Sequence, residues 1–160
     1  MIKGSTQGED VTIVIYAPNI GAPRYIQQIL TDTKGEIDGN TITVGDFNTP
    51  LTPMDRSSRP KTNKATEILK ETIEKLDLID IFRTLHPKES EYTFFSSVHG
   101  TFSRIDHIMG HKANHNKFWS IEIISSIVSD HNSMKIEIYH RKRNEEKPTT
   151  WRLNNRLLKS

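Results

Sequence analysis

The chain has 160 residues, enough for one domain with a modest hydrophobic core. It contains no cysteine, which excludes a disulfide scaffold and a thiolate metal site, and its 22 basic and 20 acidic residues leave a formal net charge of +2. No apolar run is long enough to cross a membrane and no apolar signal segment opens the chain, so we expect an intracellular protein of the nucleus or cytoplasm without a membrane partner.

The first half of the chain alternates predicted strands with predicted helices. A β-branched run at 11–16 predicts a strand, and Pro23 opens a helix. A second strand is expected at 40–44, and apolar residues at helical spacing predict a helix from about Asn63. After a short helical turn at 80–85, apolar runs predict strands at 92–95, 104–109, 121–124 and 134–139. This order predicts a layered α/β domain.

The segment 140–160 differs from the rest in its charge. It carries seven Lys or Arg residues against Glu145 and Glu146, whereas 1–139 has a slight excess of acidic residues. A basic segment behind an acidic body is compatible with nucleic acid binding, although it is more often a solvated terminus. We therefore assign 1–139 to the domain and 140–160 to a basic linker.

Polar residues collect where the predicted strands end. Because side chains alternate along a strand, Asp46 and Asn48 are expected to point the same way, with Phe47 opposite. Ligands of layered α/β folds bind beyond strand ends, so we expect one cleft lined by this segment and three others. Each segment also has a purely structural interpretation, since Asp-x-Asn is often a turn and Tyr16 is also typical of a core aromatic residue. The three other segments are 16–19, 106–107 and 129–131.

The order of these segments resembles that of the endonuclease/exonuclease/phosphatase superfamily, which includes DNase I-like nucleases. The matching motifs are "GDFN" (45–48), "IDHI" (105–108) and "SDH" (129–131). Within the superfamily, the chain is most similar to the endonuclease domain of mammalian long interspersed element retrotransposons. The motifs of this narrower resemblance are "IYAPN", "GDFNTPL", "DLIDIFRTLHP", "EYTFFS" and "TTWRLNN".

The resemblance implies the C-terminal half of that endonuclease domain. Its expected fold class is α/β, as half of a four-layer α/β/β/α sandwich of the DNase I-like type, with a mixed sheet and flanking helices. A half-sandwich would leave the inner face of its sheet without a partner sheet, so we expect the isolated chain to be poorly soluble.

The resemblance also implies catalytic roles. Asp46 would orient or deprotonate the water that attacks phosphorus, and Asn48 would hold that water or a phosphate oxygen. His131 would bind the scissile phosphate, and Asp106 would fix the tautomer of His131 and favour its protonated form. Tyr16 would donate its phenol to the phosphate.

DNA and Mg²⁺ are the partner and cofactor that the resemblance implies. Asp130 matches the carboxylate beside the family's histidine, and would be a metal ligand or support one. The positions that would contact DNA or its phosphates are Asn19, Arg56, Thr93 and Ser129. Arg56 is interpreted equally well as a solvated loop charge.

The family's principal metal ligands, an Asn and a Glu, come from an N-terminal half that has no counterpart in this sequence. Glu9 and Asp10 are the acidic residues before Tyr16, and they lie in a segment predicted to be a loop. A cation held by Asp46 and Asp130 alone would bind weakly, so the chain is expected to be truncated and inactive alone.

Three functions are compatible with the sequence. The first is a Mg²⁺-dependent DNA endonuclease, with the missing N-terminal half-domain or a reverse transcriptase as a further partner. The second is a catalytically dead fragment of a retroelement that still binds DNA. The third, phosphomonoester hydrolysis of lipid or inositol phosphates, is disfavoured because "EYTFFS" and "TTWRLNN" resemble the retroelement branch.

Overall fold

The computed structural model of the chain describes residues 2–6, 10–58, 61, 63–142 and 145–153. Its α-helices are α1 (Ala22–Asp32), α2 (Lys64–Lys75) and α3 (Ile81–Leu85), and its 3₁₀ helices are η1 (Lys34–Glu36), η2 (Pro53–Asp55) and η3 (Lys112–Lys117). The first seven strands are β1 (Ile2–Thr6), β2 (Asp10–Tyr16), β3 (Thr41–Asp46), β4 (Leu78–Asp80), β5 (Phe94–Ser96), β6 (Thr101–Ser103) and β7 (Asp106–His111). The last three are β8 (Phe118–Ile124), β9 (Ser133–Lys142) and β10 (Glu145–Leu153).

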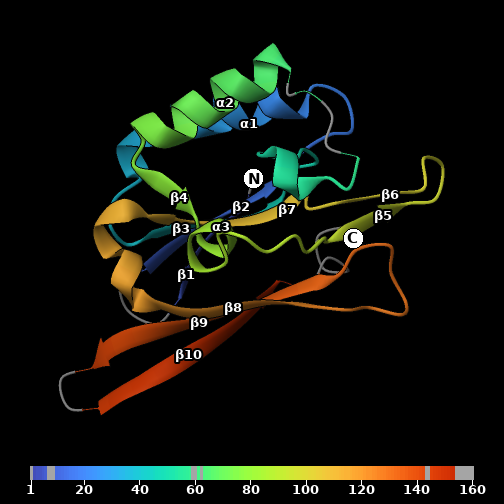
Figure 1. Ribbon diagram of the computed structural model, residues 1–160. Helices are drawn as coiled ribbons and strands as arrows, with labels where there is room; N and C mark the ends of the chain where they lie inside the picture. The colour runs from blue at the N-terminus through green and yellow to red at the C-terminus, as the bar shows by residue number, and fades with distance from the viewer. Residues whose placement is uncertain (1, 7–9, 59–60, 62, 143–144, 154–160) are drawn as a thin grey trace.

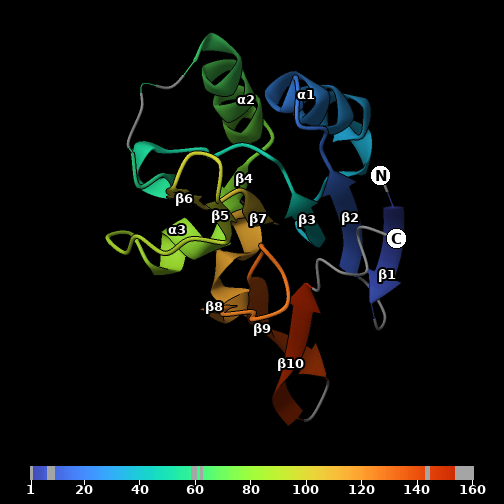
Figure 2. The ribbon, with the colours of Figure 1, turned by 90° about the vertical axis from the view of Figure 1, so that its right-hand side faces the viewer.

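These elements form a layer of helices, a mixed sheet and a second sheet (Figures 1 and 2). Helices α1 and α2 cover one face of a five-stranded sheet of order β1-β2-β3-β7-β4, and the three-stranded sheet β10-β9-β8 lies on the other face. Strands β2 and β3 are parallel because α1 carries the chain back between them, whereas β7 pairs antiparallel with both β3 and β4. The hairpin β5–β6 projects from one end of the layers.

The helices begin where the sequence predicts. Pro23 lies in the first turn of α1, and the side chain of Asn63 caps α2 by accepting a hydrogen bond of 2.8 Å from the backbone N–H of Thr66. Asp80 caps α3 in the same way. The predicted mixed sheet with flanking helices is therefore confirmed, including the start of each of the three α-helices.

Two hydrophobic cores hold the layers together. The core between the helices and the five-stranded sheet is built from buried apolar residues of both, including Ile13, Ile15, Ile26, Leu30, Phe47, Leu69 and Ile73. The core between the two sheets includes Ile42, Val44, Ile108, Phe118, Ile121, Met134 and Ile136. Each apolar side chain buried in this way contributes about 1.5–3 kcal/mol relative to its exposed state.

The second core corrects the expectation of an exposed inner face. The side of the five-stranded sheet turned away from α1 and α2 packs on β8 and β9, because alternate residues of these strands are apolar and point toward it. The outer face of β8–β9 is polar and aromatic instead, with Trp119 53% exposed and Lys135 within 3.5 Å of the carboxylates of Glu122 and Glu137. The structure thus removes the basis for the predicted poor solubility.

The two ends of the chain differ from the predicted loop and linker. Part of the predicted N-terminal loop forms β1, which pairs antiparallel with β2. Residues 145–153, in the predicted linker, form β10 and pair with β9, while 143–144 and 154–160 lie outside the described residues. The division at residue 140 stays a prediction. Within the described ranges, no helix has the length and apolar character needed to span a membrane.

Candidate active site

Asp46 ends β3 between two neighbouring strands. It lies opposite Tyr16 in the parallel pair with β2 and opposite Asp106 in the antiparallel pair with β7. Directly opposed residues of antiparallel strands have Cα atoms about 4.5–5.5 Å apart and side chains on one face, so this register sets two carboxylates side by side. Gly45 permits the arrangement, because it has φ +143° and a Cβ there would collide with the carbonyl oxygen of Ile15.

Asn48 reaches the same place through a turn. Its φ of +50° ends the strand geometry, and its backbone N–H donates a 2.8 Å hydrogen bond to Oδ1 of Asp46. The turn interpretation of Asp-x-Asn is therefore right, and the expected shared strand face is wrong because β3 stops at Asp46. The side chain of Asn48 turns to Asn19, donating through Nδ2 a hydrogen bond of 2.6 Å to Oδ1.

His131 lies between the two carboxylates. Its Nδ1 is 2.8 Å from Oδ2 of Asp106, and its Nε2 is 3.8 Å from Oδ2 of Asp46. A carboxylate only accepts hydrogen bonds, so Nδ1 is the donor to Asp106, and Nε2 is directed toward Asp46. All three residues are buried, with His131 6% exposed. The structure thus brings together three of the predicted catalytic residues, whose roles stay predictions.

The surroundings of Asp46 favour its protonated form. Burial raises the pKa of Asp46 to about 6, and the negative charge of Asp106 acts in the same direction. The charge of His131 and the hydrogen bond from the N–H of Asn48 act against this rise. A carboxylate whose pKa approaches neutrality is a stronger base than an ordinary one, which is what a group that takes a proton from water requires.

The same three residues could hold a divalent cation. One ligand atom from each of Asp46, Asp106 and His131 lies within 4.8 Å of the others. Oδ1 of Asp106 is buried and has no hydrogen-bond partner among the described residues, which leaves one carboxylate oxygen free for a cation. Hard cations such as Mg²⁺ bind through one or two carboxylates and keep water or substrate phosphate as their other ligands. The donor set fits an ion of that kind.

Three predicted residues surround this cluster without joining it. Tyr16 is 47% exposed at the end of β2. Ser129 holds the turn before His131, because its Oγ accepts a 3.2 Å hydrogen bond from the backbone N–H of His131. Asp130 is exposed and lines a separate cavity of about 400 Å³ beside the β5–β6 hairpin. Since Asp130 is not among the three grouped donors, its role as a metal ligand stays a prediction.

Thr93 has a different position from the one that the resemblance implies. Its side chain is 0% exposed, so its hydroxyl offers no surface to DNA in this structure. Oγ1 instead accepts hydrogen bonds from the backbone N–H groups of Ile105 and Asp106, at 3.1 and 3.2 Å. The direct DNA contact expected of Thr93 is thus replaced by a contact inside the protein.

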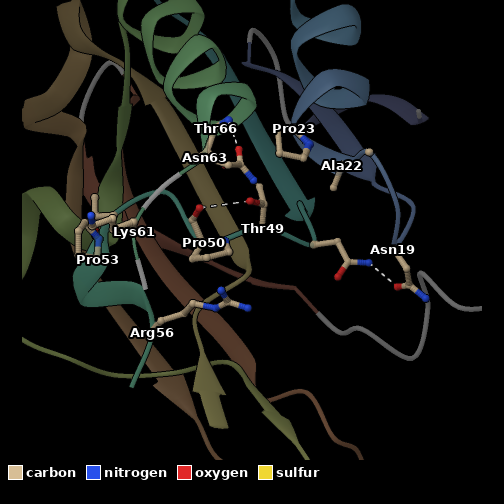
Figure 3. A pocket seen from close by; sticks show the side chains of 13 residues that line it. Asn19, Ala22, Pro23, Thr49, Pro50, Pro53, Arg56, Lys61, Asn63 and Thr66 are labelled. Carbon is tan, nitrogen blue, oxygen red and sulfur yellow. Dashed lines mark hydrogen bonds between the residues drawn. The ribbon is translucent and has the colours of Figure 1, made fainter. Parts of the chain in front are cut away.

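A polar hollow of about 270 Å³ lies next to the cluster, between the starts of α1 and α2 (Figure 3). Asn48 belongs to its lining and hydrogen-bonds to Asn19, which also lines it. Two cationic residues, Arg56 and Lys61, line it as well, and none of its described lining residues is acidic. Figure 3 shows the Arg56 side chain extending below Pro50 toward the side where Asn19 lies. The hollow has the lining expected of a site for an anion.

Sequence reasoning missed a buried ionic network behind this hollow. The side chain of Arg104 is fully buried, with Nε 2.9 Å from Oδ1 of Asp55 and its two Nη atoms 3.1 and 2.5 Å from the carboxylate of Asp80. Arg83 adds a 2.8 Å contact to Asp55. Burial, the largest single effect, would raise the pKa values of both aspartates, but Arg104 and His107, joined at Asp55 by Arg83, together outweigh burial and lower them.

This network fixes the segment that carries Arg56. Oδ2 of Asp55 accepts from the N–H groups of Leu51 and Thr52, and the ring Nε2 of His107 is 2.9 Å from the carbonyl oxygen of Thr49. Although Asp55, Asp80 and His107 also group as donors, the two carboxylates are already paired with Arg104. The only local signal for the network was the Arg104 that precedes the "IDHI" motif.

Comparisons with solved structures identify the fold. The 3′ phosphatase NExo from Neisseria, bound to a product DNA hairpin, aligns with a TM-score of 0.71 and 18% identity over 85% of this chain and 63% of its own. An AP endonuclease from Archaeoglobus fulgidus gives 0.64 and 18%, over 76% and 58%. The endonuclease domain of TRAS1, a telomere-specific non-LTR retrotransposon, gives 0.65 and 16%, over 87% and 62%. The chain thus has the DNase I-like fold and spans about three fifths of each of these structures.

Sequence comparisons agree with the fold. The "Transposon TX1 uncharacterized 149 kDa protein" of Xenopus laevis is 28% identical over 149 residues, which is 90% of this chain and 11% of that protein. The family model described as "Endonuclease/Exonuclease/phosphatase family" matches residues 8–131, a span that contains all three members of the Asp46, Asp106 and His131 cluster. The chain therefore belongs to the Endonuclease/Exonuclease/phosphatase family.

Proposed function

We propose that this chain carries the water-activating and phosphate-binding residues of a Mg²⁺-dependent DNA endonuclease of the retrotransposon type. The observation that carries the proposal is the position of His131 between two buried carboxylates, 2.8 Å from Asp106 and 3.8 Å from Asp46. The adjoining hollow, lined by Arg56 and Lys61, supports a polyanionic substrate.

In the proposed reaction, Asp46 accepts the proton of a water molecule whose oxygen forms a bond to phosphorus. The bond between phosphorus and the leaving sugar oxygen breaks, that oxygen takes up a proton from solvent, and Asp46 then releases its own proton to solvent. The backbone N–H of Asn48 holds Asp46 in place by donating a hydrogen bond to Oδ1 of Asp46. Oδ2 of Asp46 is then left to receive the proton. His131 stabilises the charge that develops on the phosphate, while Asp106 holds its ring by Nδ1. Asp46 and Asp106 would hold Mg²⁺, which when bound would supply further charge neutralisation at the phosphate.

The retroelement assignment rests on sequence. It is supported by the similarity to the transposon TX1 protein and by the motifs "EYTFFS" and "TTWRLNN". A mammalian long interspersed element, a reverse transcriptase partner and a separate N-terminal half-domain belong to the same proposal. A catalytically dead fragment that binds DNA is the second candidate, favoured by the cationic lining of the hollow, which does not depend on the reacting cluster.

Nicking of supercoiled plasmid in Mg²⁺ tests the proposal. Because the resemblance implies that an Asn and a Glu of an N-terminal half-domain complete the metal site, we expect weak metal binding and no detectable nicking by the chain alone, and nicking when that half-domain is supplied in trans. Asp46→Ala and His131→Ala should each abolish that nicking. Plasmid binding without nicking in any combination would favour the DNA-binding fragment. Strong nicking by the chain alone, lost in Asp46→Ala, would confirm the chemistry and contradict the need for a second half.

A further inference from the structure

The segment 93–95 joins the two sheets beside the cluster. On one side, the N–H of Thr93 donates a 3.0 Å hydrogen bond to the carbonyl of Ser103, in the chain that leads into β7. On the other side, the carbonyl of Thr93 accepts a 2.7 Å hydrogen bond from the N–H of Asn132, and Phe94 forms a bridge with His131. The segment therefore contacts the chain before β7 and the chain before β9.

This matters because Asp106 and His131 come from different sheets. Asp106 begins β7 of the five-stranded sheet, whereas His131 precedes β9 of the three-stranded sheet. No strand pairing between those two sheets is present among the described residues, so their register does not set the 2.8 Å contact. The bonds made by Thr93 run directly to the neighbours of both side chains.

The hydroxyl of Thr93 completes the connection. Oγ1 accepts from the N–H of Ile105 at 3.1 Å and from that of Asp106 at 3.2 Å, using both of its acceptor positions. The carbonyl of Ile105 in turn accepts a 2.9 Å hydrogen bond from the N–H of Phe47, the residue after Asp46. One buried hydroxyl therefore holds the backbone of Ile105 and Asp106 directly. Through the carbonyl of Ile105, it is linked to Phe47, the residue that follows Asp46.

We infer that Thr93 is a positioning residue that sets the geometry of the Asp106–His131 pair. A threonine suits this place because its hydroxyl supplies the acceptor and its branched Cβ restricts χ1, so that the acceptor stays aimed at the two N–H groups. Valine has nearly the same shape without the acceptor, and serine has the acceptor without the methyl group. The inference deepens the proposed function, but it is tested without any catalytic step.

The test is the NMR signal of the Nδ1 proton of His131 in the full 160-residue chain. In the wild type this proton is held by Asp106, so we expect a downfield signal that exchanges slowly with water. In Thr93→Val, exchange should be faster by about tenfold or the signal should be lost, because two buried N–H groups lose their acceptor and the backbone of Asp106 shifts. Thr93→Ser should keep the signal.

Thr43→Val is the matched control. Thr43 is also fully buried, in β3 of the five-stranded sheet that contains Asp106, and its Oγ1 has no hydrogen-bond partner among the described residues, so this variant should keep the wild-type signal. An unchanged signal in a folded Thr93→Val would overturn the inference. If Thr93→Val does not fold, Thr93→Ser decides: a folded serine variant that lacks the signal contradicts the role of the hydroxyl. None of these results depends on nicking, so failure here is distinguishable from failure of the proposed function.

Discussion

Replacing Asp46 by asparagine should stabilise the chain while removing its proposed base. Asparagine keeps an oxygen that can accept the hydrogen bond from the N–H of Asn48, and it removes a negative charge that is buried next to Asp106. The pKa of Asp46 is raised from 3.8 to about 6 on folding, mainly by burial and then by the charge of Asp106. A shift of about two units corresponds to about 3 kcal/mol of destabilisation by the ionised carboxylate.

The sign of this effect fixes its pH dependence. Since the folded pKa lies above the unfolded one, the stability that goes with the protonated carboxyl is fully present below about pH 4 and is lost as the pH rises through about 6. The free energy of unfolding of Asp46→Asn should therefore exceed that of the wild type by a gap that opens between pH 4 and 6 and stays constant above. Urea denaturation at several pH values measures this gap, and Asp32→Asn, at an exposed carboxylate of α1, controls for net charge. Equal stabilities of Asp46→Asn and wild type at pH 8 would refute the reasoning.

Three further predictions concern the network, the hollow and the metal. Arg104→Met should lower the free energy of unfolding by about 3–5 kcal/mol in urea denaturation, because it removes the cation paired with Asp80 and leaves Asp55 with Arg83 alone in the interior. Since the pKa values of both aspartates are lowered in the folded state, the stability they contribute should be present above about pH 4 and fall away in more acidic solution. Arg56→Ala and Lys61→Ala should each reduce the slope of log K, the binding constant for duplex DNA, against log salt by about 0.9. Lys112→Ala on η3 should leave that slope unchanged. Equal slopes for all three variants would show that the hollow is not part of the DNA interface. Mn²⁺ should broaden the NMR signals of Asp46, Asp106 and His131 first, and broadening centred on Asp130 would transfer the metal site there.

The elements of the fold were predictable because their signals are local. The β-branched run before Tyr16, Pro23 at the start of α1 and the Asn63 cap of α2 each act within a few residues. The contact of Asp106 with His131 was expected through the resemblance, since these residues are 25 positions apart and no spacing rule joins them.

The remaining features depend on chain geometry that residue patterns do not encode. Alternation along a strand placed Asn48 on the face of Asp46, but the positive φ of Asn48 replaces the strand by a turn at that residue. Asp55 and Arg104 are 49 positions apart, and they meet because the loop after β3 folds back on the start of β7. Thr93 lies in the segment predicted as a strand at 92–95, where a threonine is ordinary. Only its burial and its two N–H partners distinguish it from a surface threonine, and neither is visible in the sequence.

The exposed inner face that the half-sandwich implied is absent for a related reason. Strands β8 and β9 were predicted individually, but the sequence does not tell which sheet their apolar face packs against. In the structure that face packs against the five-stranded sheet. Ile121, Ile136 and Ile138 all point into the core between the sheets.

Plasmid nicking by Asp46→Asn, compared with the wild type, tests the central claim most directly. The comparison is made in Mg²⁺ with the proposed N-terminal half-domain supplied in trans, at a pH above 6, where Asp46→Asn should be the more stable of the two chains. If Asp46 is the base beside His131 and Asp106, the variant is folded, binds DNA and does not nick, because its amide cannot accept the proton from water. Wild-type nicking rates in a folded Asp46→Asn would show that the cluster is not the reacting centre.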